Sequence, residues 1–255
     1  MKAYLAFCKK ELLESWRTWR AIIMLAAFVV FGILSPATAK LLPVLLNGAD
    51  MGGGLILHLP TPTALDSWTQ FFKNVGQMGM LVVVIVFSGI VANELSRGTL
   101  INMLTKGMRR STVILAKFSV AADIWAVSYL VCLGVAYAYT AFYWPGKALP
   151  HMALAFAAPW VFGLLLIALL ILGGVAFKSL YGSLLTTGGA VVAMNLLNLI
   201  PQFSKYNPVS LASGTLGLLS KQNVPGDFLP ALWICLALTA ALIAASILIF
   251  NRKEL

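Results

Sequence analysis

The sequence is dominated by apolar stretches of about 20 residues, each long enough to cross a hydrocarbon core of ~30 Å as a helix. In hydrocarbon, a helix satisfies its own backbone hydrogen bonds, so such stretches favour helices over other structures. The composition agrees, because 60% of the residues are hydrophobic and 10% are charged, against about 25% charged in soluble domains. We therefore predict an all-α membrane protein that forms one domain over residues 1–255 in the plasma membrane.

The apolar stretches predict about six membrane-spanning helices. Their approximate limits are 21–39, 70–92, 118–143, 152–177, 183–200 and 228–250. Two longer connections, 40–69 and 201–227, are rich in proline and glycine and are expected to form loops on one side of the membrane. Partial re-entry of these loops into the bilayer stays open, since both also contain apolar pieces.

The distribution of basic residues predicts the orientation. The two termini and the connections on their side carry 13 lysines and arginines, whereas the other side carries five. Those five are Lys40, Lys73, Lys147, Lys205 and Lys221. Because basic loops stay in the cytoplasm, we expect both termini there.

Residues 1–20 precede the first apolar stretch and are expected to form an amphipathic helix in the membrane interface. Its apolar residues recur at spacings of three and four, which places them along one stripe. They are Leu5, Cys8, Leu12, Trp16 and Trp19. Lys9, Lys10 and Glu11 add charge to the same helix. The alternative is a plain cytoplasmic extension of the first span.

Motifs for chemistry within this chain are missing. The sequence has no GxxxxGK[ST] phosphate loop, no HExxH and no GxSxG, so neither nucleotide binding nor hydrolysis is expected here. Three separate cysteines and two distant histidines do not have the spacing of a metal site. No basic stretch is interleaved with stacking aromatics, so nucleic acid is not an expected partner. The expected surroundings are the lipid bilayer.

The most informative segment is 93–117, which joins the second and third spans on the cytoplasmic side. Leu100, Met103 and Leu104 share one face of a short helix that Thr99 is expected to cap. Such a helix is suited to docking an apolar ridge into a groove on a soluble partner. The alternative is a basic anchor that rests on anionic lipid.

This segment resembles the cytoplasmic motif of permease subunits of ABC transporters of the type-2 exporter family. In that family a Glu ends the second span, Gly-Thr follows, then come a short coupling helix, a basic residue and a Lys that opens the third span. The matching positions are Glu94, Gly98, Thr99, the segment 100–104, Arg109 or Arg110, and Lys117. Residues 7–14, with Lys9, Lys10 and Glu11, are similar to the opening elbow helix of the family.

The resemblance implies a permease that lines the translocation pathway as a pair, with a second copy or a homologous permease. A separate cytoplasmic ATPase would bind ATP and Mg and push on the coupling helix. The residues implied in this coupling are Glu94, Arg97, Gly98, Thr99, Leu100, Met103, Leu104, Arg109 and Arg110, with Lys9, Lys10, Glu11, Trp16 and Trp19 in the elbow helix. Two alternatives remain, a self-sufficient secondary transporter and a membrane scaffold or immunity protein that transports nothing.

Three polar residues inside the spans are candidates for a transport pathway. Asp123 is the one carboxylate in the interior of a span, and ionisable groups within a membrane are functional candidates. Asn195 and Asn198 share a helical face in the fifth span. The alternatives are an Asp123 that reaches the nearby interface, and asparagines that hold helices together.

Overall fold

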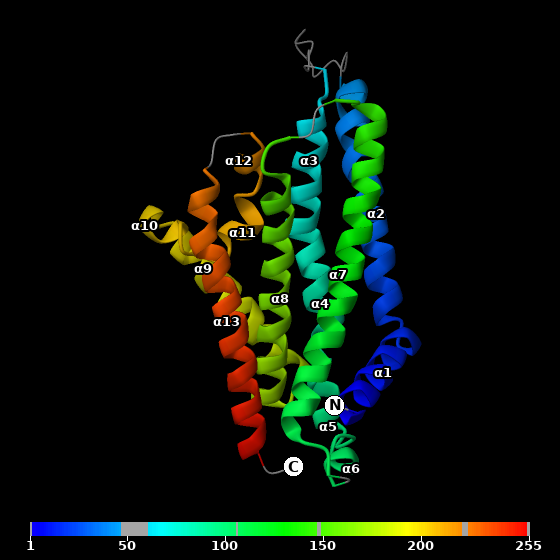
Figure 1. Ribbon diagram of the computed structural model, residues 1–255, viewed down its shortest axis with the longest axis vertical. Helices are drawn as coiled ribbons and strands as arrows, with labels where there is room; N and C mark the ends of the chain where they lie inside the picture. The colour runs from blue at the N-terminus through cyan, green and yellow to red at the C-terminus, as the bar shows by residue number, and fades with distance from the viewer. Residues whose placement is uncertain (1, 47–60, 106, 147–148, 221–223, 254–255) are drawn as a thin grey trace, which may run out of the picture.

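A computed structural model describes residues 2–46, 61–105, 107–146, 149–220 and 224–253. All regular structure in these ranges is helical, which confirms the all-α fold class. Six helices of the described ranges are long and apolar enough to cross a membrane. They stand side by side as a bundle, and α1 and the end of α13 lie at the same end of it (Figure 1). We call this the terminal end and the other the far end.

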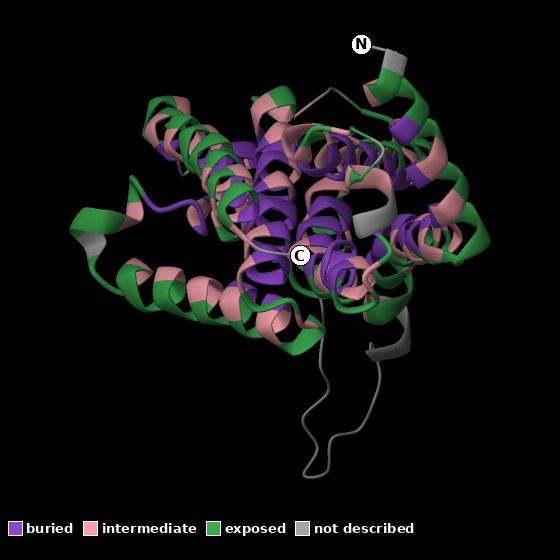
Figure 2. Ribbon diagram, turned by 90° about the horizontal axis from the view of Figure 1, so that it is seen from below, coloured by how far each residue is buried: buried purple, intermediate pink, exposed green. Residues whose placement is uncertain are grey.

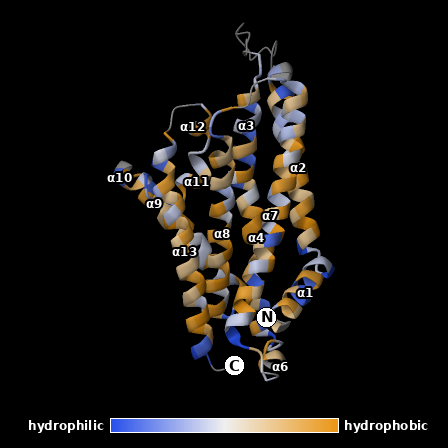
Figure 3. Ribbon diagram, in the orientation of Figure 1, coloured by the Kyte–Doolittle hydropathy of each residue, from blue (hydrophilic) through white to orange (hydrophobic). Residues whose placement is uncertain are grey.

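The six spans follow the predicted order. They are α2 (Arg20–Leu46), the second span Ala64–Ser96, α7 (Arg110–Tyr143), α8 (Met152–Phe177), α9 (Leu180–Asn198) and α13 (Pro225–Arg252). The second span is built from α3 (Ala64–Lys73), the π-helix η1 (Asn74–Gly79), α4 (Met80–Phe87) and α5 (Ala92–Ser96). Figure 3 shows apolar residues along the middle of the bundle.

Several helices extend beyond the apolar stretches that predicted them. α7 begins at Arg110 rather than near Phe118, so the last eight residues of the predicted coupling segment, 110–117, are part of this 34-residue helix. Serine, threonine and lysine in its first turns do not interrupt a helix, whereas they do end an apolar stretch. At ~1.5 Å per residue α7 is about 51 Å long, which exceeds the hydrocarbon core.

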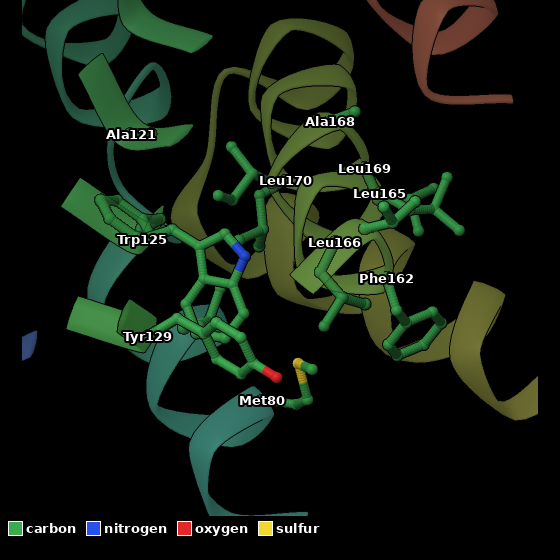
Figure 4. Close-up of a cluster of buried hydrophobic side chains, with 14 of the residues drawn as sticks. Met80, Ala121, Trp125, Tyr129, Phe162, Leu165, Leu166, Ala168, Leu169 and Leu170 are labelled. Carbon is green, nitrogen blue, oxygen red and sulfur yellow. The ribbon is translucent and has the colours of Figure 1, made fainter. Parts of the chain in front are cut away.

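The middle of the bundle is α8, which packs against α7, α9 and α13. Aromatic residues of α7 meet it in the core (Figure 4). The Trp125 indole donates a hydrogen bond to the Trp160 carbonyl (3.0 Å), and the Tyr129 hydroxyl donates to the Phe156 carbonyl (2.7 Å). A Cβ at Gly163 would lie 2.5 Å from the Trp125 ring, so glycine permits this contact. Buried residues therefore gather at the centre and exposed ones at the periphery (Figure 2).

The N-terminal segment forms α1 (Lys2–Arg17), which is set at an angle to α2 (Figure 1). The turn between them includes Trp19, whose φ is 63°. α1 packs against α7, and its residues Phe7, Glu11 and Ser15 are buried at i, i+4 and i+8. The predicted apolar stripe with Leu12 and Trp16 faces away from the bundle instead, which suits contact with lipid.

The two predicted loops at the far end contain more helix than expected where they are described. α2 continues to Leu46 and α3 begins at Ala64, capped by Thr63 and Asp66, whereas 47–60 of the predicted loop 40–69 lie outside the described residues. The loop 201–227 contains α10 (Pro201–Ser204), α11 (Ser210–Ser213) and α12 (Leu216–Leu219). Buried Leu211 and Leu218 hold this loop on the bundle.

Candidate functional site

A network of charged side chains joins three helices at the terminal end. At its centre is Lys117 of α7, whose side chain is 1% exposed. Its ammonium donates a hydrogen bond to Glu11 of α1 (Nζ to Oε2, 2.8 Å) and forms an ion pair with Glu94 of α5 (Nζ to Oε2, 2.8 Å). One cation thus connects the predicted elbow helix, the end of the second span and the start of the third.

Lys10 forms the outer layer of the same network. Its ammonium lies 2.9 Å from Glu11, 2.6 Å from Glu14 and 2.8 Å from Glu94. Burial acts to lower the pKa of Lys10, but hydrogen bonds with Glu14, Glu94 and Glu11 outweigh it, and the pKa is raised above its ordinary value of 10.5. Lys10 is therefore firmly protonated at neutral pH.

The network consists of two lysines and three glutamates, so its formal charge is −1. The carboxylates of Glu11, Glu14 and Glu94 lie within 4.8 Å of one another, close enough to hold a metal ion. The ammonium groups of Lys10 and Lys117 already lie among them, so these lysines take the place of a cation. Losing either partner of such a buried pair leaves an uncompensated charge, which is strongly destabilising.

The end of α5 is fixed by a glycine. Gly98 has a φ of 67°, a left-handed conformation that glycine adopts at low cost. The Thr99 amide donates to the Glu94 carbonyl (3.2 Å) and the Gly98 amide to the Leu95 carbonyl (3.3 Å), the pattern of a Schellman cap. The Thr99 hydroxyl also points to the Glu94 carbonyl, at 3.3 Å. Thr99 thus closes α5, whereas it was expected to cap the next helix.

The predicted coupling helix is the single turn α6 (Ile101–Leu104). Leu100 just before it is 1% exposed, so it anchors the turn on its own chain and offers no side chain to a partner. This corrects the expectation of an outward ridge containing Leu100. Met103 and Leu104 are half-buried, so part of each side chain stays accessible.

A cleft of about 460 Å³ lies beside the network, between α1 and the α5–α6 segment. Lys10, Glu14 and Arg20 line one side. Glu94, Arg97, Thr99 and Met103 are among the residues on the other side. Arg97 is exposed and lines the cleft, so its side chain is accessible to a partner. The carboxylate of Glu94 is instead paired with Lys10 and Lys117. The cleft offers charged groups of both signs beside two apolar side chains, Ile90 and Met103, which suits a protein partner.

The remaining predicted coupling residues lie apart from the network. The Arg110 guanidinium donates to the carbonyls of Phe250 and Lys253, both at 2.5 Å, and so stabilises the C-terminal end of α13. Arg109 just before it is exposed, as are Lys9 and Trp16 in the elbow helix. Trp19, in the turn after α1, is exposed as well.

The three pathway candidates are not brought together. Asp123 is exposed on α7. Asn195 lines a second, larger cavity on the other side of the bundle and donates to the Val191 carbonyl (2.9 Å). The Oδ1 atom of Asn198 is buried and accepts no hydrogen bond within the described ranges.

Among the network residues, Glu94, Lys10 and Glu11 were predicted from the sequence as coupling or elbow residues. Lys117 was named only as the lysine that opens the third span, and Glu14 was not among the predicted residues. A signal for Lys117 does exist. Lys117 begins an otherwise apolar stretch, and Glu11 shares its face with Phe7 and Ser15 at helical spacing. Two opposite charges, each on an inward face, favour a pair, but which faces meet is decided by tertiary packing.

Comparisons with known proteins agree with a multi-pass membrane protein. No family model matches the sequence. The chain is similar to YxlG of Bacillus subtilis (strain 168), an uncharacterized transmembrane protein, with 22% identity over 215 residues that cover 83% of each chain. The similarity thus extends over most of the six-helix bundle.

Proposed function

We propose that this chain is the membrane-spanning permease subunit of an ATP-driven exporter of the type-2 ABC family. It would pair with a second copy or a homologous permease and form the translocation pathway. A cytoplasmic ATPase subunit would supply the energy, with ATP and Mg bound in that partner. No enzymatic step is assigned to this chain.

The observation that supports this proposal most is the meeting of Glu94, Lys10 and Lys117 in one network. The resemblance rests on residues from three distant parts of the sequence, the elbow helix, the end of the second span and the start of the third. In the fold these residues are direct partners at 2.8 Å. A motif whose members touch is better support than the same residues merely in the same order.

The network also suggests how force would travel. A partner seated in the cleft beside Arg97 and Met103 would press on the α5–α6 segment. Because Glu94 is held by both lysines, displacement of α5 would move α1 and α7 with it. Rigid helices of this length transmit such a movement across the membrane with little bending.

The proposed orientation places the terminal end in the cytoplasm. The sequence carries 13 basic residues on that side against five on the other, and basic residues favour the cytoplasmic side. A cytoplasmic ATPase would then reach the cleft directly.

The test is purification of the full-length chain from its native membrane in mild detergent, followed by mass spectrometry. Recovery of an ATPase with a phosphate-binding loop, in a one-to-one ratio, is expected. A chain that transports its substrate in liposomes without any ATPase would overturn the proposal in favour of a secondary transporter.

A pair of variants tests the cleft itself. Arg97→Glu reverses an exposed charge that lines the cleft, and we expect it to weaken ATPase binding by about tenfold, near 1.4 kcal/mol. Arg252→Glu is the matched control, because Arg252 is exposed at the same end but lies outside the cleft. Equal ATPase binding by the two variants would remove the cleft from the interface.

A further inference from the structure

A cavity of about 710 Å³ lies between the second span and α9, on the side of the bundle away from α1. The α3–η1–α4 stack forms one wall and α9 the other, with α8 behind and α11 and α12 at the far end. Its volume is within the range of ~300–1,000 Å³ that is typical of small-molecule sites. The functional site described above uses none of its residues.

The depth of the cavity in the membrane follows from the length of the second span. Lys73, on the cavity wall, precedes Glu94 by 21 residues, which corresponds to about 31 Å along a helix. That distance is close to the ~30 Å of a hydrocarbon core. With Glu94 at one membrane surface, Lys73 lies near the other. Val84, the deepest lining residue of this wall, is about 16 Å further in.

The lining changes character along this depth. Near the far end it is polar, with Thr69, Lys73 and Gln77 on one wall and Asn195 on the other. Towards the membrane centre it is apolar, with Val84 of α4 and Leu166 of α8. One cavity therefore offers a polar upper part and a hydrocarbon-like lower part.

The charged side chain in the polar part is that of Lys73, and no carboxylate of the described residues lines the cavity beside it. Unlike Lys10, Lys117 and Lys205, Lys73 forms no ion pair with a carboxylate within the described ranges. An ammonium at headgroup depth attracts an anionic headgroup. The apolar part below it favours a ligand that also has a hydrocarbon chain over a purely hydrophilic anion.

Two features of the backbone keep the cavity open. The π-helix η1 lies in its wall, and π-helical turns widen a helix and are frequent at functional sites. Across from it, a Cβ at Gly188 would meet no atom within 4 Å. The absence of a side chain at this lining position leaves space that a larger residue would fill.

We propose that this cavity binds an amphipathic molecule with its anionic head at Lys73 and its hydrocarbon chain between α4, α8 and α9. The ligand enters at the far end, where the outer membrane leaflet meets water. Two sources share this chemistry, a phospholipid of that leaflet and an amphiphile taken up from water. The proposal goes beyond the ATP-driven function and holds with or without an ATPase.

The test is photolabelling of the full chain in phosphatidylcholine nanodiscs, without ATPase. The probes are phosphatidylglycerol and phosphatidylcholine that carry the same diazirine in the acyl chain, and mass spectrometry maps the labelled peptides. We expect the phosphatidylglycerol probe to label the cavity walls about fivefold more than the phosphatidylcholine probe, since a lysine near the surface contributes about that factor for anionic lipid. Equal labelling by both probes would overturn the assignment of the head to Lys73.

Matched variants separate the cavity from the general surface. Gly188→Phe fills the cavity, and we expect at least a fivefold loss of labelling, whereas Gly189→Phe is the control because Gly189 also has open space but does not line the cavity. Lys73→Gln is expected to abolish the preference for the anionic probe and Lys73→Arg to retain it. Equal labelling of both glycine variants, or a preference unchanged in Lys73→Gln, contradicts the proposal.

Competition identifies the source of the ligand. Dodecyl phosphate added from water and unlabelled phosphatidylglycerol in the bilayer are compared as competitors. Competition by both indicates a site open to single-chain amphiphiles from water, and competition by phosphatidylglycerol alone indicates a leaflet lipid. Competition by neither, with labelling intact, overturns the proposal. None of these outcomes depends on ATPase binding, so the two proposals fail separately.

Discussion

Two lysines of similar chemistry occupy opposite situations in this bundle. Lys117, at the terminal end, is buried between Glu11 and Glu94. Lys73, towards the far end, is exposed and lines an open cavity, without an acidic partner among the described residues. A paired, desolvated charge fixes helices to one another, whereas an unpaired charge at a cavity mouth is free to attract a ligand. Burial and pairing, more than residue type, therefore distinguish a structural cation from a binding one.

The largest difference in stability is expected between variants of these two lysines. Lys117→Met removes the shared partner of two carboxylates, and we expect a loss of about 3–5 kcal/mol in the free energy of unfolding. Lys73→Met removes an exposed cation and is expected to change it by less than about 0.5 kcal/mol. Reversible unfolding in mixed micelles measures both. Similar losses in the two variants would show that the lysines are not in different situations.

The second prediction concerns the cap that holds Glu94 in the network. Gly98→Ala places a Cβ in a left-handed conformation, and we expect a destabilisation of about 1–2 kcal/mol. Gly134→Ala in α7 is the control, because a Cβ there meets open space and alanine is tolerated in a helix. The same unfolding assay applies. A neutral Gly98→Ala would mean that the turn adapts without strain.

The third prediction concerns how the stability that Lys10 contributes depends on pH. The pKa of Lys10 is raised above 10.5 in the folded chain, so its contribution to stability is fully present below that pH and is lost as the pH rises through the folded value. The stability difference between wild type and Lys10→Met is expected to stay constant from about pH 6 to pH 9, and to shrink above 10.5. A difference that already shrinks near pH 8 would contradict this.

The smallest effect is expected from the exposed pair at the far end. Lys205 and Asp227 lie 3.0 Å apart, but both side chains are about half exposed to solvent. The Asp227 hydrogen bond raises the pKa of Lys205, yet solvent screens such pairs. Lys205→Met is therefore expected to leave the unfolding midpoint unchanged. A clear shift would show that an exposed pair can act like the buried network.

Much of the candidate site was predictable from the sequence, and its departures have physical reasons. Glu94 was predicted as a coupling residue and Lys10 and Glu11 as elbow-helix residues because of their place in the resemblance, but their meeting in one network was not predicted. The expectation that Leu100 faces a partner was wrong, because periodicity reveals which residues share a face but not where that face points. The contacts of Lys117 and the cavity beside Lys73 depend on residues far apart in the sequence, which no local pattern joins.

The sequence by itself determined that the chain crosses the membrane with six apolar helices, because the length and polarity of each stretch must match the bilayer. It did not determine which helix becomes the centre. α8 and α13 are equally apolar, yet 72% of the most apolar stretch of α8 is buried and 22% of that of α13. Lipid and protein interior are both apolar, so hydropathy does not distinguish them. Packing alone, through contacts such as Trp125 against Gly163, placed α8 in the middle.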